Sequence, residues 1–141
     1  MAPLLLLTLG AADLPTANAT LDVSVSGLRS DKGVVLICLT GDAAHFPDCS
    51  KDKAARNLRV TAAKSGNLVF SDLRPGAYAL SMIHDENDNG KMDVALFVPR
   101  EGFGFSRNPV ILTGPPKFRS AQFTVAEGSE TRQSVRMKYM F

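Results

Sequence analysis

The 141-residue sequence has no tryptophan, only two cysteines and two histidines, and a formal net charge of just +2. This near balance of charge argues against a dedicated nucleic-acid-binding protein, because such domains concentrate cations on one face. No apolar run approaches the roughly 18 residues that a membrane-spanning helix needs, so we expect no such span. With 45% hydrophobic residues the chain can still build a core, and its length favours one domain.

The N-terminal segment differs in composition from the rest of the chain. An apolar stretch, Leu4–Leu9, is followed by Pro15 and by the small residues of Ala17-Asn18-Ala19. This order resembles a secretory signal peptide cleaved after Ala19. We therefore expect residues 1–19 to be a signal peptide and residues 20–141 to be a single domain that is periplasmic or secreted. The alternative is an N-terminal strand or core segment, which Pro15 disfavours.

Cys38 and Cys49 are the two cysteines of the sequence. In an exported chain the oxidising compartment favours a disulfide between them, and closing a loop of this length contributes about 3 kcal/mol through the entropy of the unfolded chain. A zinc site formed by the two thiolates and His45 is a second interpretation, but the neighbourhood supplies too few further ligands.

Short strand-like segments dominate the remainder. Apolar Leu21, Val23 and Val25 alternate with polar residues, which is typical of a half-buried strand. The nearly continuous apolar segment 33–40 suits a central strand. Further candidate strands, separated by turn residues, are 58–62, 67–70, 76–84, 121–126 and 131–139. About seven strands without a long helical pattern predict an all-β fold, an antiparallel β-sandwich.

The stretch Phe70–Tyr78 combines a strand end at Leu73, a Pro75-Gly76 turn and a tyrosine that opens the next strand with its ring inward. It is similar to the turn F-x-x-L-x-P-G-x-Y of prealbumin-like and carboxypeptidase-regulatory-like sandwiches. The resemblance implies a prealbumin-like or immunoglobulin-like sandwich and implies no activity.

An acidic loop follows the segment 76–84. Counted from Asp85, oxygen-bearing side chains occupy the first, third, fifth and ninth positions, and a glycine is sixth. This spacing lets alternate side chains and the carbonyl of the seventh residue converge on one hard cation, so it predicts a weak calcium site. The predicted ligands are Asp85, Asn87, Asn89, Lys91 through its carbonyl, and Asp93.

The calcium loop departs from an EF-hand, because Leu96 stands where the bidentate glutamate would be. Glu101 or Glu86 is the candidate for the missing carboxylate. The alternative is a metal-free hairpin in which the Asp and Asn side chains cap their own turns.

Two aromatic residues follow the acidic loop. Glycines flank Phe103, and Phe105 comes next. The two rings either plug one end of the sandwich or stand exposed as a recognition surface for a protein, peptide or glycan.

Several of these segments together resemble the signature of domain-of-unknown-function family 2141, a family of bacterial exported proteins. The segments that carry the resemblance are Gly27-Leu28, 46–49, 70–78, 84–93, 99–106, Asn108 and 114–118. The resemblance extends from about Leu21 to Tyr139, although Arg107 stands where the family has Asn. It implies export and assigns no activity.

No G-x-S-x-G, H-E-x-x-H or reactive-cysteine pattern occurs in the sequence. We therefore expect a non-catalytic binding or envelope-interaction module, with calcium as its candidate cofactor. Its expected partner is a protein, peptide or glycan of the cell envelope, and not a nucleic acid. The alternative is a metal-assisted hydrolase in which His84 and Glu101 serve as acid or base beside the ion, which requires both residues at an open cleft. A locally bonded His84 at the strand end would speak against it.

Overall fold

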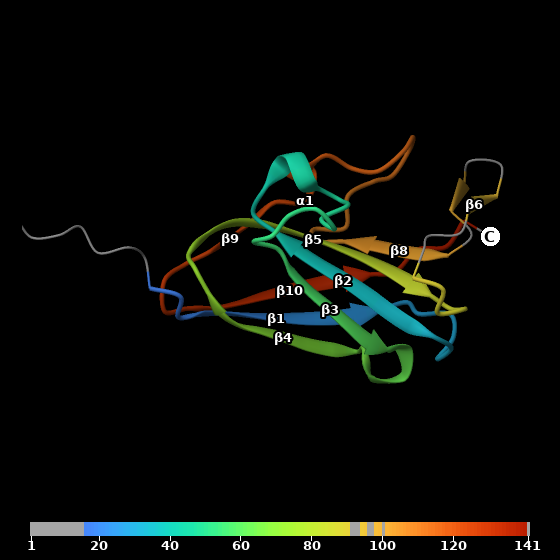
Figure 1. Ribbon diagram of the computed structural model, residues 1–141, viewed down its shortest axis with the longest axis horizontal. Helices are drawn as coiled ribbons and strands as arrows, with labels where there is room; N and C mark the ends of the chain where they lie inside the picture. Colours follow the sequence, from blue (N-terminus) through green and yellow to red (C-terminus); the bar gives the residue numbers. More distant parts are fainter. Residues whose placement is uncertain (1–15, 91–93, 96–97, 100, 141) are drawn as a thin grey trace, which may run out of the picture.

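The computed structural model describes residues 16–140 except 91–93, 96–97 and 100 (Figure 1). Two of the predicted calcium ligands, Lys91 and Asp93, and most of the predicted signal peptide lie outside the described residues. None of the helices within the described part of the chain is long and apolar enough to cross a bilayer.

Two β-sheets pack face to face as the two layers of a sandwich (Figure 1). The first sheet has the order β10-β1-β4, formed by Glu130–Arg136, Ala19–Ser26 and Asn67–Leu73. The second has the order β3-β2-β5-β8, formed by Arg56–Thr61, Val34–Thr40, Gly76–Asp85 and Gly102–Phe105. The short strand β9 (Phe123–Val125) pairs with the start of β5, and β6 (Val94–Ala95) forms a hairpin with β7 (Val98–Pro99). The predicted all-β sandwich is confirmed.

One pair of strands differs from the antiparallel expectation. β1 and β10 run parallel, with Thr20 opposite Glu130 and Ser26 opposite Arg136. The reason is that β9 belongs to the second sheet, so residues 126–129 carry the chain across the sandwich and deliver β10 to the end at which β1 starts.

The main core lies between the two sheets. In β1 alternate residues are buried, and Leu21 and Val23 have no exposed surface, as the period of two in the sequence predicts. β2 is central, between β3 and β5, and six of its seven residues are buried. This double-sided burial explains why segment 33–40 is almost uniformly apolar rather than alternating.

Short helical turns flank the sheets: η1 (Ala43–His45), η2 (Ala62–Lys64) and α1 (Phe118–Ala121).

The predicted disulfide is confirmed, since Cys38 near the end of β2 is bonded to Cys49 with a Cα–Cα distance of 6.3 Å. The zinc site of Cys38, Cys49 and His45 is therefore wrong, because the disulfide uses both thiols. Tyr78 packs partly against the core, and its hydroxyl donates to the carbonyl of Arg74 at 2.6 Å.

Candidate functional site

Asp85 anchors the acidic loop at the end of β5. Its side chain is fully buried, and its carboxylate accepts hydrogen bonds from the backbone N–H groups of Asn89 at 3.2 Å and of Gly90 at 2.8 Å. Gly90 has a φ of 74°, a left-handed conformation that glycine adopts without strain. Asp85 thus caps the turn, while each carboxylate oxygen retains a second lone pair that a cation can use.

Glu86 points away from the loop that Asp85 caps. Its Oε1 accepts from Nε of Arg29 at 2.8 Å, and its Oε2 accepts from the hydroxyl of Ser30 at 2.9 Å. The hydrogen bond from Arg29 lowers the pKa of Glu86, more strongly than burial raises it. Of the two candidates for the missing calcium ligand, Glu86 therefore already binds Arg29 and Ser30 with its two carboxylate oxygens.

Glu101 directly precedes β8. The antiparallel pairing of β5 with β8 sets His84 opposite Gly102, and continuing this register by one residue sets Glu101 opposite Asp85. Both carboxylates are buried, Asp85 with 0% and Glu101 with 4% of its surface exposed. Opposing residues of an antiparallel pair share one face of the sheet, so carboxylates at these two positions could both offer oxygen ligands to one cation.

The remaining described ligand candidates, Asn87 and Asn89, lie on the exposed part of the loop. Asp88, between them, has a φ of 51° and pairs with Arg59 of β3 at 2.5 Å. The loop is therefore fastened to the second sheet at Asp85 and through Asp88, which leaves both asparagines on its outer side.

His84 is a fully buried residue of β5 with both ring nitrogens bonded. Its Nε2 lies 2.7 Å from the carbonyl oxygen of Lys32, and its Nδ1 lies 2.7 Å from the hydroxyl of Tyr139. Because a carbonyl only accepts, Nε2 carries the proton and Nδ1 accepts from Tyr139. Both His84 and Glu101 are buried, so the hydrolase alternative gains no support from this geometry.

Tyr139 follows β10 of the first sheet, and its bond to His84 connects this end of the chain to β5 of the second sheet. Its hydroxyl also accepts the backbone N–H of Arg29 at 3.2 Å, and the guanidinium carbon of Arg29 lies 4.5 Å from its ring centroid. Burial raises the pKa of Tyr139. A Cβ at Gly102 would collide with this ring, so only glycine fits there. The network of Arg29, His84, Gly102 and Tyr139 holds the strand ends from which the acidic loop departs.

Phe103 and Phe105 belong to a second apolar cluster on the outer side of the second sheet. They are 5% and 8% exposed, and Phe46 packs edge-on against Phe105 with ring centroids 5.9 Å apart. Phe118 also packs against this cluster. Of the two arrangements that the sequence leaves open for these rings, the structure has the packed one, so they offer no exposed recognition surface.

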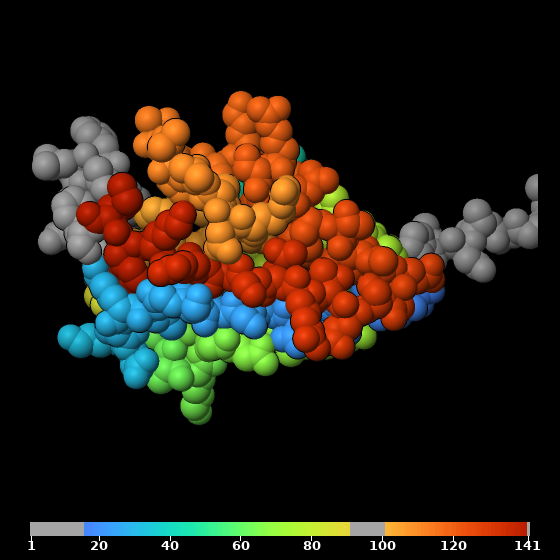
Figure 2. All heavy atoms as spheres, turned by 180° about the vertical axis from the view of Figure 1, so that it is seen from behind, coloured from blue at the N-terminus to red at the C-terminus, as the bar shows by residue number. Residues whose placement is uncertain are grey.

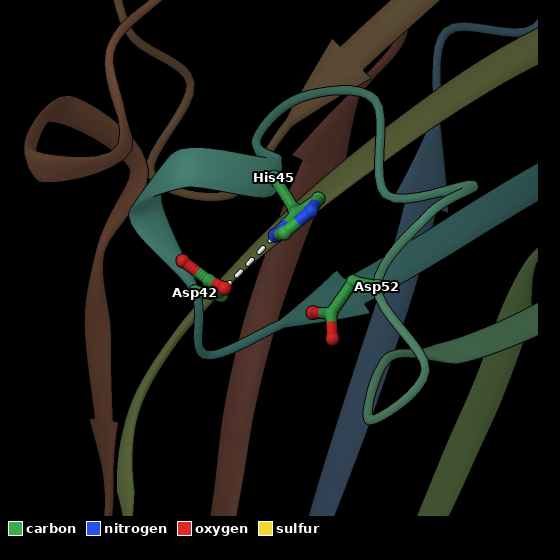
Figure 3. Close-up of side chains that lie close together, drawn as sticks. All are labelled: Asp42, His45 and Asp52. Carbon is green, nitrogen blue, oxygen red and sulfur yellow. Dashed lines mark hydrogen bonds and ion pairs between the residues drawn. The ribbon is translucent and has the colours of Figure 1, made fainter.

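A third group, which the sequence did not single out, lies at the loop closed by the disulfide (Figure 3). Asp42 accepts from the N–H of Ala44 at 2.9 Å and bonds Nδ1 of His45 at 2.8 Å, and the bond to His45 lowers the pKa of Asp42. Asp52 accepts from the buried hydroxyl of Thr40 at 2.5 Å. An imidazole and two carboxylates could hold a divalent ion, but their existing bonds account for their positions as local caps.

Comparison with known protein families identifies one match. Residues 23–133 match the family described as an uncharacterised protein conserved in bacteria, DUF2141. The chain has no match among curated proteins or among solved structures. Because the match covers well over half of its length, the chain belongs to the DUF2141 family of uncharacterised bacterial proteins.

Proposed function

We propose that this chain is an exported, non-catalytic binding or envelope-interaction module whose acidic loop, residues 85–93, is ordered by calcium. The observation that supports the proposal is the burial of two carboxylates, Asp85 at the end of β5 and Glu101 just before β8, beside a loop rich in oxygen ligands. The function we assign is recognition and not catalysis, because His84 has both nitrogens bonded within the fold.

Export to the periplasm or beyond is supported by the disulfide and by the bacterial family. Disulfides persist in the periplasm and outside the cell, whereas cytosolic reductants keep thiols reduced. Cell fractionation, followed by thiol alkylation and intact-mass measurement, tests this part. We expect an extracytoplasmic protein that begins after Ala19 and in which Cys38 and Cys49 resist alkylation; a cytosolic, reduced, full-length chain would contradict export.

Calcium suits this site because every proposed ligand atom is an oxygen. The ligands are Asp85, Asn87, Asn89, the carbonyl of Lys91, Asp93 and Glu101. Hard oxygen donors on a loop of this kind favour calcium over softer metals, and the small number of carboxylates sets the expected dissociation constant at about 10⁻⁴ to 10⁻³ M. Calcium at such a concentration is available to an extracellular module but not to a cytosolic one.

Calorimetric titration with CaCl₂ tests the site directly. We expect one calcium ion per chain for the wild type and at least about a tenfold weaker affinity for Glu101→Gln, because the variant removes one of the ligand charges. Glu127→Gln, at an exposed position outside the loop, is the matched control and is expected to bind as the wild type does. Wild-type affinity in Glu101→Gln would remove Glu101 from the site, and no heat at millimolar calcium would refute the site.

The proposed partner is a protein, peptide or glycan of the cell envelope. Since calcium would fix the exposed side of the acidic loop, capture of such a partner should depend on calcium if this loop takes part in recognition. Pull-down from an envelope extract with calcium, and in parallel with a chelator, tests this dependence. Equal capture in both conditions would separate the partner surface from the acidic loop.

A further inference from the structure

The segment 107–119 connects β8 to α1 and is fastened at both ends. At its start, the side chain of Asn108 donates to the carbonyl of Ser134 at 2.9 Å and accepts from the N–H of Arg136 at 2.8 Å. At its end, Phe118 packs against the second apolar cluster. Figure 2 shows this segment, in orange, standing out from the surface above the red β10.

Between these anchors the chain alternates in burial. Ile111 packs against the same cluster, whereas its neighbours Val110 and Leu112 are 80% and 86% exposed. Ile111 thus anchors the segment to the cluster, while both of its neighbours face solvent. Three prolines at 109, 115 and 116 restrict the backbone around this tip. The exposure of Val110 and Leu112 is therefore built into the segment.

Basic residues flank this apolar tip in the sequence, and two more line the hollow that Ile111 also lines. The residues 102–126 and 131–141 contain no aspartate or glutamate. Five basic residues lie close to the tip in the sequence or line the hollow beside it. Within the described part of the chain, none of the five forms an ion pair. These are Arg107, Lys117, Arg119, Arg136 and Lys138. Arg136 and Lys138 belong here because they line a shallow hollow together with Asn108, Pro109 and Ile111.

We propose that the segment 107–119 is a membrane-docking loop, which inserts Val110 and Leu112 into the interface of an anionic lipid bilayer while the neighbouring lysines and arginines bind its phosphate headgroups. An apolar tip with basic residues on either side of it in the sequence has the two attractions that interfacial binding combines, burial of apolar surface and attraction to anionic lipid. An acidic protein would satisfy the cations but would not by itself need the two aliphatic side chains.

This inference deepens the proposed envelope role. It rests on that role only for the identity of the membrane, which would be one of the cell envelope. Its test uses the purified full chain with lipid vesicles and a chelator, so it depends neither on calcium nor on export. A failure here leaves the calcium site and the export prediction standing, and their failure leaves the vesicle result standing.

The absence of tryptophan makes the insertion directly observable. Leu112→Trp places a single tryptophan at the tip, and Val69→Trp places one on β4, where Val69 is 53% exposed. Vesicles of phosphatidylcholine containing about one third phosphatidylglycerol are expected to shift the fluorescence of Trp at position 112 to shorter wavelength and to leave Trp at position 69 unchanged. Pure phosphatidylcholine vesicles are expected to give at most a small shift.

Co-sedimentation with the same vesicles separates the two attractions. We expect Val110→Ser with Leu112→Ser to lower the partition coefficient about tenfold, and Lys117→Gln with Arg119→Gln to lower it by a similar factor. Val69→Ser is the control and should not change it. All of these positions are exposed, so circular dichroism should show unaltered folding.

Three results would overturn the docking loop. The first is no binding to anionic vesicles. The second is binding without a blue shift at position 112, or binding that the serine variants leave unchanged, since the apolar tip would then play no part. The third is binding to a soluble acidic protein such as polyglutamate but not to vesicles, which would assign the cations to an acidic partner.

Discussion

Replacing Tyr139 by phenylalanine removes one hydroxyl from a buried network and leaves the ring in place. The hydroxyl donates to Nδ1 of His84 at 2.7 Å and accepts from the N–H of Arg29 at 3.2 Å. His84 is fully buried, so its Nδ1 would lose a partner that water cannot replace, at a cost of about 1–3 kcal/mol. The bond from Arg29 is solvent-exposed, so water can replace it and its loss adds little. We therefore expect Tyr139→Phe to lower the free energy of unfolding by about 1–3 kcal/mol.

Urea unfolding at neutral pH measures this loss, and Tyr78→Phe supplies a matched control. The hydroxyl of Tyr78 donates to the carbonyl of Arg74 at 2.6 Å, in a solvent-exposed bond. Water can take over that carbonyl, so the control should lose less than about 1 kcal/mol. If Tyr139→Phe is no more destabilising than Tyr78→Phe, the buried bond to His84 does not contribute as we argue. Nitrogen NMR of the wild type should in addition show His84 protonated at Nε2.

Three further predictions concern the fold around the site. Gly102→Ala should cost about 1–3 kcal/mol in urea unfolding because the new methyl group meets the ring of Tyr139; an unchanged midpoint would contradict this close approach. Glu86 has a pKa below its ordinary value of 4.5, so its bond to Arg29 adds stability above that pH that is lost as the pH falls. Glu86→Gln should therefore lose stability at pH 7 and flatten the acid side of the stability profile, whereas a profile of unchanged slope would argue against it. Reduction of the disulfide, whose cysteines are 11 residues apart, should cost about 3 kcal/mol, as unfolding with and without dithiothreitol will show; equal midpoints would mean that the bond leaves the unfolded chain unconstrained.

Much of the sandwich follows from local patterns in the sequence. The alternation at Leu21, Val23 and Val25 and the apolar run at 33–40 predict β1 and β2 closely, because each pattern reflects how many faces of the strand are buried. No such local pattern predicts the strand at 102–105. Its glycines are typical of a loop, yet it forms β8, since Gly102 fits against Tyr139 and Gly104 against Val135, and both are contacts between distant parts of the chain.

The candidate site could be predicted only in part for the same reason. The spacing from Asp85 to Gly90 is local, and the cap that Asp85 forms with Asn89 and Gly90 follows from it. The choice between Glu86 and Glu101 depends on the pairing of β5 with β8 and on Arg29, which lies in another part of the chain. The cluster around His45 likewise needed the fold, because Asp52 is brought to it by the turn after the disulfide.

The thermal unfolding midpoint, measured with a chelator and then with about 5 mM CaCl₂, tests the calcium loop most directly. At about ten times the expected dissociation constant, calcium should stabilise the folded chain by about 1.4 kcal/mol. For a domain of this size we predict a rise of the midpoint by about 5 °C, with no comparable rise in MgCl₂ or in Glu101→Gln. A wild-type midpoint that calcium leaves unchanged would contradict the account and would leave the 85–93 segment a hairpin that caps itself.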